Sequence, residues 1–106
     1  MELNLPILDL LDNSETILIA GAGGGFDVYA GLPLFFTLKA MGKDVHLANY
    51  SFSDATLASM FTEVIVEIPD ILVACKGEMK RDMYYYTEGY LTDWLSKKTD
   101  FDPTVW

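Results

Sequence analysis

An uninterrupted apolar run that ends in a cluster of glycines is the feature that most constrains this chain. Residues 16–20 (Thr-Ile-Leu-Ile-Ala) are uncharged and rich in β-branched side chains, and residues 21–25 (Gly-Ala-Gly-Gly-Gly) follow at once. A run without polar alternation is typical of a central parallel strand that is covered on both faces. We therefore expect such a strand at 16–20, followed by a glycine-rich turn into a helical stretch that begins at Asp27.

The rest of the chain alternates between strand and helix patterns. Pro33 lies inside the helical stretch, so the helix either begins near Leu32 or kinks there, and Gly42 is placed to cap its end. The segments that we expect are helices at 5–12, 27–41, 53–60 and 87–98, strands at 16–20, 44–49, 63–68 and 71–75, and the start of a further strand at 102–106. This alternation predicts βαβ units and a mostly parallel sheet, in a Rossmann-like three-layer α/β/α fold.

The sheet that these segments can form is small. Residues 1–106 contain no linker or repeat, so we expect a single α/β domain. A parallel sheet needs both of its faces covered. Either another subunit completes this sheet, or the chain is a piece of a larger fold. An unpaired sheet edge is also a template for pairing between chains, and we expect a homo-oligomer.

Composition limits the partners of this chain. Seven basic and 16 acidic residues give a net charge of −9, which argues against binding to nucleic acid or to an anionic membrane surface. No apolar run reaches the roughly 18 residues of a membrane-spanning helix, and no basic segment precedes an apolar one as in a signal peptide, so we expect a cytoplasmic protein. The single cysteine, Cys75, excludes an internal disulfide and a zinc site with several thiolates. The acidic residues show no metal-ligand spacing, and we expect no metal site.

The glycine cluster predicts an anion site. Four glycines within residues 21–25 place bare backbone N–H groups at the start of a helix, where the helix dipole attracts negative charge. Ligands of open α/β sheets also bind beyond the carboxyl ends of the strands. The alternative is that the glycines only allow a tight turn and close strand–helix packing, with Asp27 as the helix cap.

Two familiar phosphate-binding patterns do not fit this turn. In the dinucleotide fingerprint Gly-x-Gly-x-x-Gly, Phe26 takes the place of the third glycine, and Asn49 stands where an acidic residue would hold the ribose. A P-loop needs a lysine, and no basic residue precedes Lys39. What remains is a phosphate, carboxylate or nucleotide held mainly by backbone N–H groups. The residues expected to contact it are Gly21, Gly23, Gly24, Gly25, Phe26, Asp27, Asn49 and Ser51.

The same segment carries a family resemblance. Residues 17–27 (ILIAGAGGGFD), 31–34 (GLPL) and 42–49 (GKDVHLAN) resemble the start of the "domain of unknown function 1152" family, with its strand, Gly-x-Gly-Gly-Gly-x-Asp turn, helix and second strand. Residues 85–95 (YYTEGYLTDWL) are similar to a later family segment, Tyr/Phe-Pro-Glu-x-Tyr-Leu-x-x-Trp/Phe, with Thr87 in place of the proline. The resemblance implies a Rossmann-like layout and marks residues 23–27 as the signature. It also implies that this chain is the N-terminal part of a longer fold, and it transfers no activity or cofactor.

Four other features could carry chemistry. We expect His46 to be a hydrogen-bonded core residue rather than a catalytic base, and Cys75 to be buried and inert. Glu88 either complements the dipole of the last helix, which we favour, or binds a metal or substrate. The aromatic residues at 84–86, 90 and 94 favour core packing or a subunit contact over stacking on bases.

These observations favour a small-molecule-binding domain for a nucleotide or phosphorylated metabolite. No residue is singled out as catalytic, and the sequence does not identify a cofactor or decide whether the protein is an enzyme. Transferase or hydrolase chemistry fits better than hydride transfer because the ribose-binding acid is missing. The alternative from another class is a non-catalytic assembly module whose glycines serve packing only.

Overall fold

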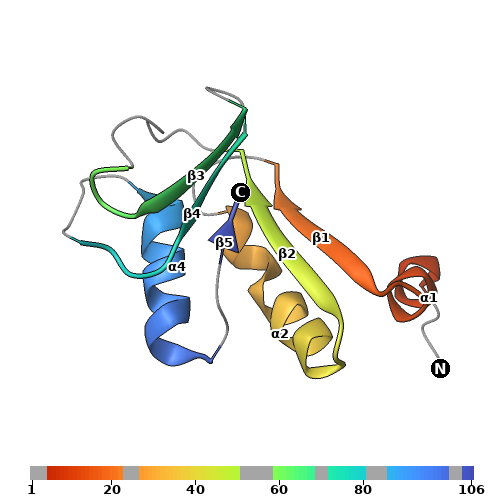
Figure 1. Cartoon of the computed structure of the whole chain (residues 1–106). Helices are drawn as coiled ribbons and strands as arrows, with labels where there is room; N and C mark the ends of the chain where they lie inside the picture. Colours follow the sequence, from red (N-terminus) through yellow and green to blue (C-terminus); the bar gives the residue numbers. More distant parts are fainter. Residues whose placement is uncertain (1–4, 23–26, 51–58, 69–71, 81–85, 101–103) are drawn as a thin grey trace.

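One mixed sheet with helices beside it forms the structure, a computed structural model that describes residues 5–22, 27–50, 59–68, 72–80, 86–100 and 104–106 (Figure 1). The elements are α1 (Pro6–Asp12), β1 (Thr16–Gly21), the 3-10 helix η1 (Asp27–Gly31), α2 (Leu32–Ala40), β2 (Asp44–Asn49), β3 (Glu63–Ile68), β4 (Leu72–Lys76), α4 (Thr87–Lys98) and β5 (Thr104–Val105). The helix expected at 53–60 lies outside the described residues except for its last two positions. None of the helices in these ranges is long and apolar enough to cross a bilayer.

The strand order is β1-β2-β5-β4-β3, which corrects two expectations. β1, β2 and β5 are parallel, whereas β4 runs antiparallel to both β5 and β3, so the sheet is mixed rather than mostly parallel. The physical reason is the short connection between β3 and β4, since residues 69–71 are too few for the crossover that a parallel pair needs. The second error concerns β1, which is an edge strand of the described sheet and not a central one.

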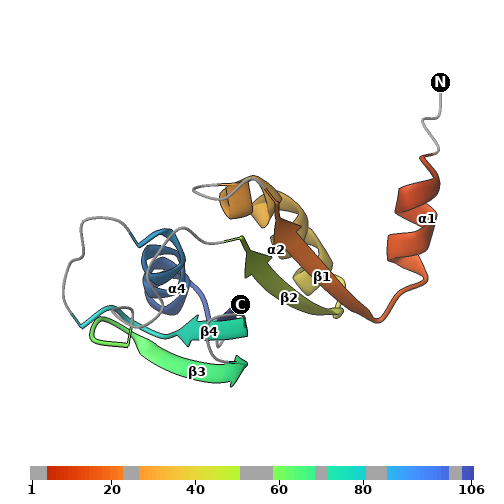
Figure 2. The ribbon, with the colours of Figure 1, turned by 90° about the horizontal axis from the view of Figure 1, so that it is seen from above.

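Both long helices cover the same face of the sheet. Leu47, Val105 and Cys75 are neighbours across β2, β5 and β4, and all three are buried in the core that α2 and α4 complete. Figure 2 shows the two helices side by side above the sheet, where the rings of Phe36 and Trp94 meet at 6.2 Å between centroids. On the opposite face Leu18 is 62% exposed. The described residues therefore form two layers, and a second helical layer is not among them.

The start and end of α2 follow from single residues. Pro33 occupies the first turn, and the helix begins at Leu32, which confirms one of the two expected arrangements. At the other end Gly42 has a φ of +81°. The N–H of Gly42 donates to the carbonyl of Lys39, and the N–H of Lys43 donates to that of Leu38. This pair of bonds is a Schellman cap, so the expected role of Gly42 is confirmed.

β5 occupies the middle of the sheet although it is the last of the described strands in the chain. Val105 pairs with Leu47 of β2 and with Cys75 of β4. The pairing with β2 continues to Trp106, whose N–H donates to the carbonyl of Leu47 at 3.0 Å and whose carbonyl accepts from Asn49 at 2.8 Å. The strand expected at 102–106 is thus present in its described part, and it joins the parallel and antiparallel halves.

Candidate functional site

The carboxyl ends of β1 and β2 lie side by side, as the proposed ligand site requires. Gly21 and Asn49 are register partners at the last position of each strand. The N–H of Tyr50 donates to the carbonyl of Gly21 at 2.9 Å, so the residue that follows β2 remains hydrogen-bonded to the end of β1. The ends of parallel strands are where open α/β sheets place their ligands.

Position 21 has no room for a side chain, so it requires glycine. A Cβ atom there would lie 2.5 Å from the side-chain oxygen of Asn49 and 2.7 Å from the backbone nitrogen of Val28. The second contact is with backbone in η1, which cannot move aside as a flexible side chain can. The packing interpretation therefore accounts for Gly21, because the chain must pass this close to bring η1 against the end of β1.

Glu88 supplies a carboxylate at the end of β2. It lies in the first turn of α4, is only 5% exposed, and its Oε1 accepts a hydrogen bond from Nδ2 of Asn49 at 2.8 Å. An acid that only complemented the helix dipole would have no need of burial or of this partner. Sequence reasoning treated the acid at the end of the second strand as missing, and the fold brings one there from α4.

The hydroxyl of Tyr29 lies near this carboxylate, and Thr87 precedes Glu88 in the chain. The hydroxyl of Tyr29 in η1 donates to the carbonyl of Thr87 at 2.9 Å, which ties η1 to the start of α4. Burial, followed by the nearby charge of Glu88 and then Cys75, raises the pKa of Tyr29 to about 12. The Oγ1 of Thr87 is buried and has no hydrogen-bond partner among the described residues, whereas most buried hydroxyls have one.

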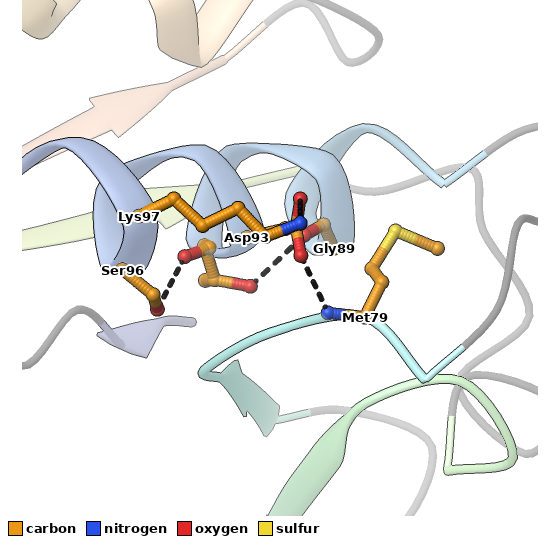
Figure 3. A network of polar contacts seen from close by, with 6 residues as sticks. Met79, Gly89, Asp93, Ser96 and Lys97 are labelled. Carbon is orange, nitrogen blue, oxygen red and sulfur yellow. Dashed lines mark hydrogen bonds and ion pairs between the residues drawn. The ribbon is translucent and has the colours of Figure 1, made fainter.

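The position of α4 is held from its far side by Asp93 (Figure 3). One carboxylate oxygen of Asp93 accepts from the backbone N–H of Met79 at 2.9 Å, and the other accepts from the ammonium of Lys97 at 3.0 Å. Because Met79 follows β4, the bond from its N–H fixes the helix to the sheet, whereas the bond to Lys97 lies within α4. The Met79 bond therefore helps to set where Glu88 lies, one turn and a half earlier in the same helix.

A buried polar cluster lies beneath α4, next to this site. The hydroxyls of Thr62 and Tyr86 are 2.6 Å apart. Burial raises the pKa of the Cys75 thiol to about 11. Burial, followed by the charge of the neighbouring Cys75, also raises the pKa of Tyr86. The thiol is thus protonated at neutral pH, which agrees with the expectation of a buried cysteine. Among the aromatic residues, Tyr86 is in the core, while Tyr90 and Trp94 are exposed by more than a third.

The prediction that His46 is a core residue is wrong. Its side chain is 47% exposed on the face opposite the helices, and its Nε2 lies 3.1 Å from the exposed carboxylate of Asp44. Val45 and Leu47 point to the helices, so the residue between them must point away from them. His46 is therefore remote from the strand ends.

The predicted site residues fall into three groups. Gly21 and Asn49 come together, and Asp27 is exposed at the start of η1. The remaining ones lie outside the described residues: Gly23, Gly24, Gly25, Phe26 and Ser51. Within the described ranges, no group of three or more His, Cys, Asp or Glu side chains is placed to hold a metal ion.

Comparison with family models, with curated proteins and with solved structures finds no match to this chain. The resemblance to the domain of unknown function 1152 family therefore stays a prediction. What the structure itself defines is a mixed α/β protein in which the buried carboxylate of Glu88 accepts a hydrogen bond from the half-buried Asn49 at the end of β2.

Proposed function

We propose that this chain binds a nucleotide or a phosphorylated metabolite beyond the carboxyl ends of β1 and β2, within a Rossmann-like three-layer domain. The observation that carries the proposal is the hydrogen bond between Asn49 and the buried Glu88 at the end of β2. In nucleotide-binding sheets a carboxylate at the end of the second strand accepts hydrogen bonds from the ribose hydroxyls. Glu88 offers that group, and Asn49 orients it.

The chemistry at the strand ends favours a ligand with both hydroxyl and phosphate groups. A carboxylate such as Glu88 accepts hydrogen bonds from hydroxyls and repels phosphate, so the two ends of the ligand must be received by different groups. The N–H groups of the glycine-rich residues 23–25 are the proposed phosphate contacts. The buried Thr87 hydroxyl adds a donor or acceptor that no described residue uses, next to Glu88 in the chain. This arrangement favours a nucleotide over a simple phosphate ester.

Native mass spectrometry of the gently purified protein tests the proposal first, because it detects a retained small molecule directly. Thermal unfolding with added ATP, ADP, AMP, ribose 5-phosphate or inorganic phosphate follows. A ligand at 100 times its dissociation constant should stabilise the fold by about 2.7 kcal/mol. A protein that carries no small molecule and gains no stability from any of these probes at millimolar concentration refutes the proposal.

Variants then separate the two ends of the ligand. Gly24→Val should abolish binding of every probe while the protein still folds, whereas Glu88→Gln should weaken the ribose-containing probes and leave inorganic phosphate unchanged. Met41→Leu, a conservative change at an exposed residue after α2, is the matched control and should bind normally. An affinity that is unchanged in Gly24→Val would show that the glycine-rich turn is not the site.

The assembly module remains a second candidate. It is favoured by one observation, the apolar side chains that the described helices leave exposed on α1 and on the sheet. Those side chains lead to a separate inference, which does not depend on a ligand.

A further inference from the structure

The chain exposes more surface than a compact protein of its mass. Its accessible surface is 7051 Å², whereas a folded monomer of 11.9 kDa exposes about 5,900 Å². Its radius of gyration is 14.7 Å, against about 13 Å for a compact chain of this length. The excess surface, about 1,100 Å², is similar to the roughly 800 Å² that each partner buries in a stable interface.

α1 contributes exposed apolar side chains to this surface. The helix has no buried residue, and Leu5, Ile7, Leu8 and Leu10 around it are each more than half exposed. Both views show α1 standing beyond β1, apart from α2 and α4 (Figures 1 and 2). A helix of seven residues is not stable in water by itself. It therefore needs an apolar surface to pack on. Within the described residues Leu11 packs against the core, whereas Leu5, Ile7, Leu8 and Leu10 remain exposed.

No strand among the described residues pairs with the outer edge of β1, beside α1. β1 contains no charged residue and no proline, and it pairs with β2 through six successive residues without irregularity. The opposite edge is different, because β3 carries Glu63 and Glu67 and a break in register between Val66 and Ile68. Charges and bulges are what proteins use to block edge pairing. The chain thus protects one edge of the sheet and leaves the other as a flat template.

We propose that β1 is the dimer interface, where it pairs antiparallel with β1 of a second copy of this chain. A two-fold axis perpendicular to the sheet, between the two copies of β1 and level with the middle of each strand, then joins two five-stranded sheets into one, with all long helices on the same side. A second copy fits because β1 is uncharged, so the net charge of −9 is not concentrated where the chains meet. The blocked β3 edge stops the assembly at two chains instead of a fibre.

The same geometry gives α1 its packing partner. α1 precedes β1 and lies near the first residues of that strand. In an antiparallel pair, the amino-terminal end of one strand lies beside the carboxyl end of the other. The leucines of α1 therefore reach the partner near the end of its β1, which is next to its own candidate ligand site. Pairing of the strands and docking of α1 bury the two unpartnered apolar features of the chain together.

Sedimentation equilibrium of the full chain tests this proposal. The native protein should be a dimer at micromolar concentration. Leu18 is exposed on β1 near the two-fold axis and should be critical for dimerisation. Leu18→Asp should weaken the dimer by at least about a hundredfold, because each dimer loses two apolar contacts and gains two nearby like charges. Ile68→Asp is the matched control, since Ile68 is 47% exposed on the blocked edge, and it should leave the dimer intact.

A second variant guards against loss of folding. Leu10→Asp, at the most exposed of the large apolar residues of α1, changes no strand and should also weaken the dimer, while circular dichroism shows that each variant is folded. Three results would overturn the proposal: a native chain that stays monomeric at about 100 μM, a folded Leu18→Asp variant that still dimerises normally, or equal dissociation in Leu18→Asp and Ile68→Asp. None of these results depends on whether the chain binds a nucleotide.

Discussion

Replacing Asn49 with aspartate should make the stability of this protein depend steeply on pH. The change puts a second carboxylate where Asn49 Nδ2 now donates to Glu88 Oε1 at 2.8 Å. Two unit charges at that distance repel by roughly 6 kcal/mol at an effective dielectric constant of about 20. Holding one proton on the pair at pH 7 costs less, about 4 kcal/mol, because an ordinary carboxyl loses its proton some three pH units lower. The folded variant should therefore keep a proton that the unfolded chain releases.

The sign of the effect follows from that proton. Above about pH 4 the folded variant binds more protons than its unfolded form, so its stability relative to the native protein falls as the pH rises, by about 1.4 kcal/mol per unit. We expect Asn49→Asp to be less stable than the native protein by about 4 kcal/mol at pH 7 and by only about 1 kcal/mol at pH 5. Urea denaturation at the two pH values measures both differences.

Two further variants make this prediction specific to the pair. In Asn49→Asp with Glu88→Gln, the amide and the carboxylate have exchanged places, and the double variant should recover to within about 1 kcal/mol of the native protein. The exposed Asn13→Asp change is the matched control and should show little dependence on pH. If Asn49→Asp loses the same stability at pH 5 and pH 7, or if Glu88→Gln does not rescue it, the hydrogen bond between Asn49 and Glu88 does not exist in the folded protein.

Two other predictions concern groups near the same site. Thr87→Val should leave the stability of the unliganded protein unchanged or slightly higher, because the Thr87 hydroxyl has no partner among the described residues. Thr92→Val in the same helix should instead cost about 1 kcal/mol, since it removes a 3.0 Å bond to the carbonyl of Gly89. Urea denaturation of both variants measures the two changes in stability. Stability should also fall as the pH rises from about 9 to 11, because the unfolded chain ionises Cys75 while burial keeps the folded thiol protonated, and Cys75→Ala should reduce that fall in a pH titration of the urea midpoint.

Features that depend on neighbouring residues could be predicted from the sequence. The start of α2 follows from Pro33 and its end from Gly42, and the bounds of β2, β3 and α4 agree with their hydrophobic patterns. Each of these features depends on a few residues in succession, and their conformational preferences are not altered by the rest of the chain.

Features that depend on the arrangement of the strands could not be predicted from the sequence. The apolar run of β1 is the same whether a strand is covered by helices or by another chain, so its position at the edge was not predicted, and the exposure of His46 follows from the same error. The contact between Asn49 and Glu88 joins residues 39 positions apart and requires α4 to lie beside β2. The one sequence signal for this contact was an acid in the first turn of the last helix, but the local pattern does not show that this turn lies beside β2.

The central position of β5 has a consequence for how the protein folds. In the described sheet, β1 and β2 are joined to β3 and β4 through β5 and the adjoining Trp106, which come after all four strands in the chain. During synthesis each half can form early from short-range contacts, but the sheet cannot be completed between them until these late residues have left the ribosome. Joining them requires Leu47 to meet Val105, a loop closure that slows folding. The two halves should therefore form as separate folding units, and cooperative unfolding of the whole protein depends on β5 together with the contacts that α4 makes with η1, α2 and β2.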